Sequence, residues 1–124
     1  MEKKQLIKEA HAKGKKEGSS TLVLIALARY KSHIYTSYIG DSGYCIFRKS
    51  KYRTNSYKTI FESKPQLKGF NFPFQIGSIG DDPKCAKSIT HKFVKNNDII
   101  ISATDGLFDN LYVWEILNII NNNV

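Results

Sequence analysis

The sequence lacks any apolar run long enough to cross a membrane. Its longest uninterrupted apolar stretch is residues 22–28, whereas a spanning helix needs roughly 18 apolar residues. The opening residues, Met1 to Lys4, lead into no apolar segment of the kind that marks a secretory signal. Because 41% of the 124 residues are hydrophobic, the chain is typical of a single water-soluble globular domain, and we expect no membrane insertion.

Cysteine is scarce as well. The two cysteines, Cys45 and Cys85, lie far apart and form neither a CxxC pair nor a Cys/His spacing. This argues against a disulfide framework and a zinc cluster. A reducing, intracellular compartment is therefore expected.

The chain is also poor in acidic residues, with 11 against 19 basic ones and a formal net charge of +8. Such a balance can indicate a nucleic-acid or acidic-lipid partner. Most of the positive charge is lysine, gathered at the N-terminus and in residues 48–53. Because lysine recognises phosphates and bases less specifically than arginine, we interpret these stretches as solvated faces and expect no nucleic-acid partner. A small basic nucleic-acid-binding domain is kept as a lower-ranked alternative.

Several catalytic signatures are missing. There is no GxxxxGK[ST] loop and no GxGxxG loop, so nothing supports a nucleotide-binding fold. The three histidines, His11, His33 and His91, have no serine or cysteine arranged beside them as a nucleophile. They are interpreted as surface or strand-edge residues.

What is present predicts an α+β fold of antiparallel strands bracketed by helices. Residues 21–29 are apolar or β-branched almost throughout, which predicts a central strand buried on both faces, the first of a three-stranded meander. Pro73 excludes a regular central strand from residues 69–77. The expected helices are residues 2–13 and a segment from residue 109 or 110 to about 118, with Leu111, Trp114, Leu117 and Ile120 on one face, and the expected strands are residues 21–29, 34–39, 44–48, 57–61, 89–94 and 99–103.

Three carboxylates stand where predicted strands end, next to small residues: Asp41, Asp105 and Asp109. Hard cations such as Mg²⁺ or Mn²⁺ take oxygen ligands, often one or two carboxylates with retained waters. The spacing leaves other interpretations open, because Asp-Gly is a common turn pair and Asp109 could be the N-cap of the following helix. Residues 18–20, Gly-Ser-Ser, are interpreted as allowing close packing before a strand, with phosphate binding as the alternative.

Four blocks of sequence, taken in order, resemble one known family. They are GSSTLVLIAL (18–27), YIGDSGYCIFR (38–48), FNFPFQIG (70–77) and DIIISATDGLFDNL (98–111). Together they resemble the metal-dependent serine/threonine protein phosphatases of type 2C, and most of all a small branch whose members are often mitochondrial. A mitochondrial or cytoplasmic location is therefore expected.

The resemblance implies a β-sandwich of two antiparallel sheets flanked by helices. Asp105 matches an aspartate that binds the catalytic metal pair, and Asp41 and Asp109 match residues of an additional, weaker metal site. The implied cofactor is Mg²⁺ or Mn²⁺, and the implied substrates are phosphorylated proteins. The implied reaction is hydrolysis of phosphoserine or phosphothreonine by metal-activated water.

Two blocks typical of the family do not occur in the sequence, namely an upstream Asp-Gly-x-Gly-Gly and a late Asp-Asp or Asp-Asn. We therefore expect residues 18–120 to be the central part of a larger domain, after a basic helical lead-in (1–17) and before a polar tail (121–124). A catalytically inactive phosphatase-like binding or scaffold module is the alternative function. The sequence makes no prediction of the oligomeric state.

Overall fold

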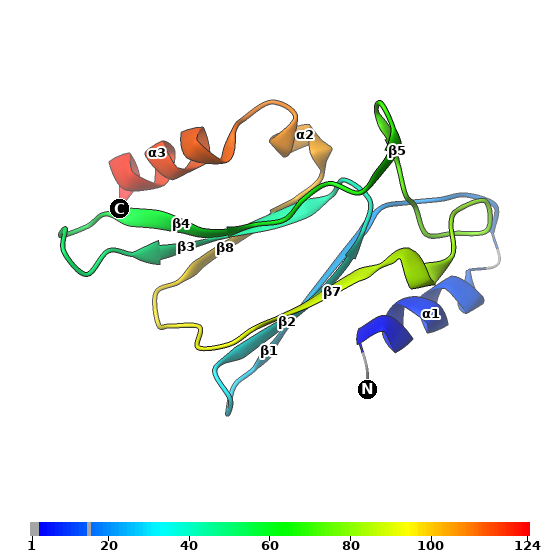
Figure 1. The fold of residues 1–124 in the computed structure, drawn as a ribbon, viewed down its shortest axis with the longest axis horizontal. Coiled ribbons are helices and arrows are strands. Elements are labelled where there is room, and N and C mark those ends of the chain that lie inside the picture. The colour runs from blue at the N-terminus through cyan, green and yellow to red at the C-terminus, as the bar shows by residue number, and fades with distance from the viewer. Residues whose placement is uncertain (1–2, 15) are drawn as a thin grey trace. The chain divides into compact units, whose positions relative to one another are not determined.

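The computed structural model describes residues 3–14 and 16–124, which form two compact units (Figure 1). The first unit comprises Met1–Ser42 and Pro65–Val94, and the second comprises Gly43–Lys64 and Lys95–Val124. In chain order the elements are α1 (Lys3–Lys13), β1 (Leu22–Ala28), β2 (His33–Ile39), β3 (Gly43–Lys49), β4 (Tyr57–Glu62), β5 (Leu67–Gly69), β6 (Phe72–Pro73), the 3-10 helix η1 (Pro83–Cys85), β7 (Lys87–His91), β8 (Ile99–Ala103), α2 (Asp105–Phe108) and α3 (Val113–Asn123).

The first unit is built on an antiparallel sheet with the strand order β1-β2-β7. Its core joins Ile7 of α1, Ile39 of β2 and Ala86, all of them buried. The helix predicted from residue 2 to residue 13 is confirmed as α1, although residue 2 lies outside the described residues. Ile7 of α1 is fully buried in this core. The division of the chain into a lead-in (1–17), a central part (18–120) and a tail (121–124) stays a prediction.

The predicted position of the first strand is wrong. Among the described strands β1 pairs with β2 alone, so it is an edge strand, and its Ile25 and Leu27 are exposed. The centre is occupied by the more polar β2, in which Thr36 and Ser37 are fully buried. Burial of these hydroxyls is compensated by hydrogen bonds across the sheet, such as the 2.9 Å bond between Ser37 and Ser88. Apolar composition alone therefore did not identify the central strand.

The second unit has a sheet with the strand order β4-β3-β8 and the helices α2 and α3. Its core contains Cys45 and Phe47 of the central strand β3 together with Val113 and Ile116 of α3. The first three strands are therefore not the predicted meander. β2 already has β1 and β7 as neighbours, so the Gly40–Gly43 turn leads the chain out of one sheet and into the other.

The C-terminal helix begins later and ends later than predicted. Tyr112 is its N-cap, and the Glu115 carboxylate accepts a hydrogen bond of 2.8 Å from the Tyr112 backbone N–H. Trp114, predicted on the apolar face, is 60% exposed, because Val113 and Ile116 point into the core instead. The predicted face residues Leu111, Leu117 and Ile120 do pack against this core.

α3 continues to Asn123, so residues 121–123 of the predicted tail are helical. Asn121 contributes to this extension. Its side chain accepts a hydrogen bond of 2.7 Å from the Tyr57 backbone N–H and donates one of 3.2 Å to the Tyr57 carbonyl.

Residues 63–86, which connect β4 to β7 along the chain, contain short elements that periodicity does not predict. β5 and β6 form a small antiparallel hairpin, and Pro73 lies in this two-stranded sheet rather than in a central strand, as expected. β7 ends at His91, before the predicted Val94, and Phe93 follows with a left-handed φ of 61°. The α+β class, with antiparallel sheets and flanking helices, is confirmed; the packing of the two main sheets as a sandwich stays a prediction.

Candidate functional site

The Thr-Asp-Gly-Leu-Phe-Asp segment, residues 104–109, turns strand β8 into the short helix α2. Thr104 is the N-cap, and its hydroxyl oxygen accepts a hydrogen bond of 3.3 Å from the Gly106 backbone N–H. Asp105 is therefore the first helical residue and is half-buried. Capping fixes the backbone that carries this carboxylate.

The apolar residues of the same segment attach α2 to the second unit. Leu107 and Phe108 both pack against the core cluster of β3 and α3. Asp109 is exposed and is the C-cap of α2, and its backbone N–H donates to the Asp105 carbonyl at 2.7 Å. The interpretation of Asp109 as the N-cap of the next helix is therefore wrong, because Tyr112 has that position.

The second predicted site segment, the Gly-Asp-Ser-Gly turn, depends on Gly40. Gly40 has a φ of 99°, and a Cβ atom at this position would collide with the Thr21 side chain and the Phe74 carbonyl oxygen. Its neighbour Asp41 is half-buried. Glycine is thus required immediately before the carboxylate, both for the backbone conformation and for the close contact.

Two residues that sequence reasoning did not identify hold this turn. The Gln66 side-chain oxygen accepts from the Gly40 N–H at 2.9 Å, and the Gln66 N–H donates to the Gly40 carbonyl at 2.9 Å. The hydroxyls of Thr21 and Ser42 are 2.6 Å apart. No sequence signal marks Gln66 or Thr21, because their partners are distant in the chain.

The Gly-Ser-Ser segment serves close packing, as interpreted from the sequence. Ser20 and Ile76 exchange two backbone hydrogen bonds of 2.8 Å. A Cβ atom on Gly77, which has a φ of 139°, would collide with the Gly18 carbonyl oxygen and the Ser19 Cα. The backbones of the two loops therefore approach one another as only glycine allows.

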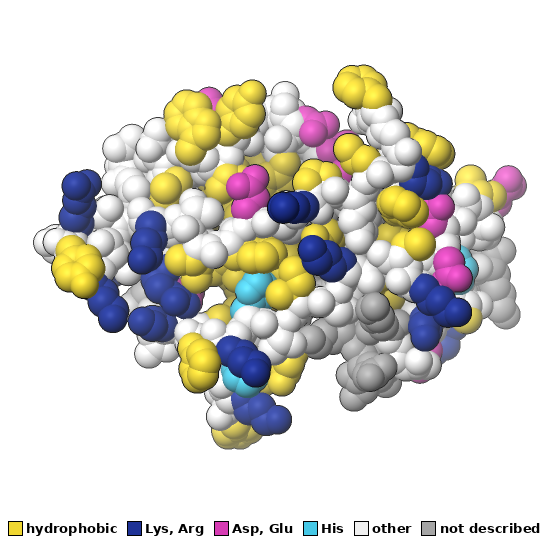
Figure 2. Space-filling model, viewed as in Figure 1, with side chains coloured by type: hydrophobic (Ala, Val, Ile, Leu, Met, Phe, Trp, Pro, Cys, Tyr) yellow, Lys and Arg dark blue, Asp and Glu magenta, His cyan; other side chains and the backbone are white. Residues whose placement is uncertain are grey.

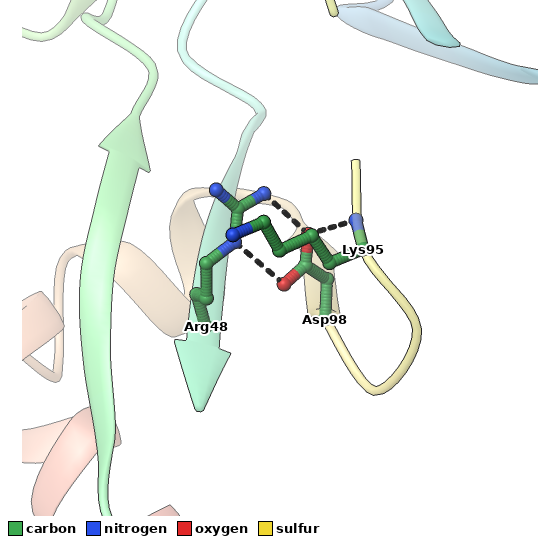
Figure 3. Close-up of polar contacts among 3 residues, drawn as sticks. All are labelled: Arg48, Lys95 and Asp98. Carbon is green, nitrogen blue, oxygen red and sulfur yellow. Dashed lines mark hydrogen bonds and ion pairs between the residues drawn. The ribbon is translucent and has the colours of Figure 1, made fainter. Parts of the chain in front are cut away.

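The turn that precedes β8 is held by an ion pair (Figure 3). The Arg48 guanidinium at the end of β3 donates to both carboxylate oxygens of Asp98, at 2.9 and 2.7 Å, and the Lys95 backbone N–H donates to the same carboxylate at 2.8 Å. Burial opposes ionisation of Asp98, but these hydrogen bonds outweigh it and hold the pKa of Asp98 below its ordinary value. The start of β8 is thereby fixed against β3.

Asp105 begins α2 and Asp109 is its C-cap, so the two residues lie four apart along one helical turn, and their grouping as metal ligands stays a prediction. Asp41 belongs to the other unit, and its grouping with them stays a prediction. Within residues 3–14 and 16–124, no three histidine, cysteine or acidic side chains cluster as metal ligands.

Comparisons with known proteins match nearly all of the chain to one family. It is 34% identical over 121 residues to "Probable protein phosphatase 2C 80" of Arabidopsis thaliana, which covers 96% of the chain and 27% of that protein. It is 38% identical over 118 residues to "Probable protein phosphatase 2C 55" of the same plant, covering 94% of the chain and 23% of that protein. The chain belongs to the protein phosphatase 2C family.

A similar match reaches outside plants. The "Protein phosphatase PTC7 homolog fig" of Drosophila persimilis is 32% identical over 123 residues, covering 87% of the chain and 35% of that protein. The protein phosphatase 2C chain thus spans about a quarter to a third of the length of these relatives. No protein-family model matches it, and no solved structure matches it significantly.

Among the described residues, none of the helices has the length and hydropathy that a membrane span requires. The mitochondrial or cytoplasmic location stays a prediction.

Proposed function

We propose that this protein phosphatase 2C chain contributes Asp105 to a metal-dependent phosphatase that hydrolyses phosphoserine and phosphothreonine in proteins. One observation carries the proposal: the segment that resembles the family's metal-binding block is built around a capped, half-buried Asp105 at the end of a strand. The rest of the segment serves to hold that carboxylate in place.

The proposed site offers the oxygen ligands that a hard cation binds. Asp105 and Asp109 offer carboxylate oxygens from one short helix, the donor type that Mg²⁺ and Mn²⁺ prefer. Two carboxylates match a site completed by waters rather than a closed protein cage. Asp105 is proposed as the principal ligand, and Asp109 and Asp41 are each proposed as further, weaker ligands.

When bound, Mg²⁺ or Mn²⁺ supplies a water acidified for attack on phosphorus and positive charge against the phosphoryl oxygens. The chain's own residues supply the position. Thr104 fixes the helix start, Leu107 and Phe108 hold α2 on the core, and the Arg48–Asp98 pair fixes the strand that leads to it.

The test measures phosphate release from a phosphothreonine peptide by the 124-residue chain with Mn²⁺. Asp105→Asn is expected to reduce the rate by about a hundredfold or more, since loss of a ligand exceeds the 10–100-fold typical of outer-shell changes. Mn²⁺ binding measured by calorimetry is expected to weaken in parallel.

Asp82→Asn is the matched control. Asp82 is exposed, and its side chain accepts from the Lys84 N–H at the start of η1, a role that asparagine also fills. Hydrolysis that survives Asp105→Asn unchanged would contradict the proposed role of Asp105.

The alternative function is a catalytically inactive phosphatase-like binding or scaffold module. It predicts that the chain binds the phosphopeptide but releases no phosphate even at high Mn²⁺. The same assay therefore separates the two functions.

A further inference from the structure

The hairpin that joins β3 to β4 carries a dense positive charge. Residues 48–58 contain five basic side chains and no acidic one: Arg48, Lys49, Lys51, Arg53 and Lys58. Arg48 is paired with Asp98. The other four are exposed and have no ion pair with any residue in the described part of the chain. In Figure 2 dark blue side chains gather over this turn, at the left of the view.

The turn itself has a defined conformation. The Ser50 N–H donates to the Ser56 carbonyl at 2.6 Å, and the Tyr52 N–H donates to the Ser50 hydroxyl at 3.3 Å. Asn55 supplies a left-handed φ of 55°. Because these bonds already fix the backbone, a partner that binds here does not have to order the loop.

The hairpin lies at the opposite end of β3 from the proposed metal ligand. Gly43, at the first end, pairs with Ala103, which directly precedes Thr104 and Asp105, whereas Lys49 at the other end pairs with Tyr57. Seven residues of strand span about 20 Å at roughly 3.3 Å per residue. A group bound at the hairpin is therefore remote from a phosphate at Asp105.

We propose that residues 48–58, the basic hairpin, dock an acidic segment of the protein substrate about six or more residues away from its phosphorylated residue. The inference rests on the proposed phosphatase function, because it names a feature of the substrate. An extended acidic peptide is complementary in charge to the four exposed basic side chains of this preformed turn, which are three lysines and Arg53. Tyr52, 95% exposed, is the one aromatic residue at the tip, which is less than a stacking surface for nucleic acid requires.

The chain contains a matched control for the hairpin. The turn between β1 and β2 presents Arg29, Tyr30 and Lys31, the same three residue types as Lys51, Tyr52 and Arg53, and all of them are exposed. Residues 25–35, a window as long as the basic hairpin, carry only these two basic charges besides His33. The variants Lys51→Gln/Arg53→Gln and Arg29→Gln/Lys31→Gln therefore remove equal charge from turns of unequal charge density.

The experiment measures binding of a fluorescent, unphosphorylated peptide with an acidic run to the 124-residue chain by anisotropy. A peptide with asparagine and glutamine in the acidic positions is the neutral reference. We expect the acidic peptide to bind more tightly, with an affinity that falls as salt rises. The double variant Lys51→Gln/Arg53→Gln should weaken binding of the acidic peptide about fivefold. The control variant Arg29→Gln/Lys31→Gln should weaken the same binding less than about twofold, as expected for exposed charge pairs. The charge-reversed variant Lys51→Glu/Arg53→Glu should instead bind a peptide with lysines in the acidic positions more tightly than the acidic peptide. Far-UV circular dichroism checks that this variant folds.

Equal effects of the two glutamine variants, or equal binding of the acidic and neutral peptides, would overturn the inference. The hairpin could instead be tested with an RNA oligonucleotide or a phosphatidylserine vesicle. If either binds more tightly than the acidic peptide and depends in the same way on Lys51 and Arg53, the assignment of a protein segment as the partner is overturned. Because the readout is binding without hydrolysis, loss of phosphatase activity leaves it unaffected. Failure of docking and failure of the proposed function are therefore distinguishable.

Discussion

Gly40 shows how a single residue determines the position of a neighbouring carboxylate. We predict that Gly40→Ala lowers the free energy of unfolding by about 2–4 kcal/mol, because it adds both an unfavourable positive φ and a steric collision. Chemical denaturation measures the loss. Gly69→Ala is the control, since nothing lies within 4 Å of a Cβ there, and an equal loss in the two variants would contradict the explanation.

The two cysteines differ in their environments. Burial, with the Glu62 charge as a smaller contribution, raises the pKa of the Cys45 thiol to about 11, whereas Cys85 is exposed. We predict that at pH 8 a thiol reagent modifies Cys85 rapidly and Cys45 only after denaturation, because the thiolate is the reactive species. Cys85→Ser should remove the rapid phase; rapid modification of both thiols in the native chain would be the contrary result.

At the level of single residues, the sequence predicts which charged residues stand at strand ends, but it does not predict the contacts that hold them in place. The position of Asp105 after a strand follows from the isoleucine run and the Asp-Gly pair. The contact of Gln66 with Gly40 does not, since it joins residues 26 apart in the chain. Such contacts depend on how the strands pair, which local patterns do not encode.

Among the elements, β3 and the turn before β8 are joined by the Arg48–Asp98 pair. We predict that Asp98→Asn lowers the free energy of unfolding by about 2 kcal/mol at neutral pH, because it weakens charged hydrogen bonds at a side chain that is only 5% exposed. Since the pKa of Asp98 is lowered in the folded chain, its contribution is present above the ordinary aspartate pKa. It is lost as the pH falls through the folded value, so the variant and the original chain should converge in acid.

Lys68 and Asp81 provide the comparison. Their nitrogen and oxygen lie 2.8 Å apart, but both side chains are more exposed than Asp98. Lys68→Met should therefore cost less than about 1 kcal/mol. A cost equal to that of Asp98→Asn would show that burial does not determine the strength of these pairs.

The elements were predicted best where local pattern and packing agree. β8 spans the predicted residues 99–103, since an isoleucine run between turn residues has few alternatives. Trp114 does not lie on the core face of α3, because the core-facing residues Val113, Ile116, Leu117 and Ile120 follow the i, i+3, i+4, i+7 spacing of one helix face, whereas the predicted set advances by three residues throughout and drifts around the helix. The start of α3 at Val113, after an N-cap tyrosine, is also later than predicted. Tyrosine is an uncommon N-cap, and the preceding Asp109 and Asn110 are much stronger signals.

For the whole molecule, the exposed edge of β1 predicts self-association. An apolar edge strand with unpaired backbone groups is a template for pairing with another chain, and Ile25 and Leu27 are exposed there. We predict that Leu27→Lys reduces concentration-dependent light scattering, because a charge on an edge strand opposes pairing.

Ile79→Lys is the control for this prediction. It removes an equally exposed apolar side chain and adds the same charge, but outside the strands. If both lysine variants reduce scattering equally, net charge rather than the β1 edge controls association.

The α+β class was predictable from the alternation of strand-like segments and turns, but the assignment of strands to sheets was not. The Gly-Asp-Ser-Gly turn after Ile39 is typical of a hairpin, yet it leads β3 to new partners. That outcome depends on β7, which pairs with β2 from 53 residues away at Thr36 and Ile89. Whether a strand pairs with a neighbour close in sequence or with a distant one depends on all the strands of the chain that can pair with it.

The interleaving of the two units has a consequence for synthesis on the ribosome. The first sheet is complete only when β7 is available, and the second needs β8, whose Ser102 contacts Gly43 across 59 residues. At about 5–20 residues per second, β2 waits roughly 3–10 s for its second neighbour. During that interval the described strands can pair only as the β1–β2, β3–β4 and β5–β6 hairpins, and lone hairpins are marginal in water. The nascent chain therefore exposes both future cores at once, and binding of chaperones to it is expected until residue 103 has emerged.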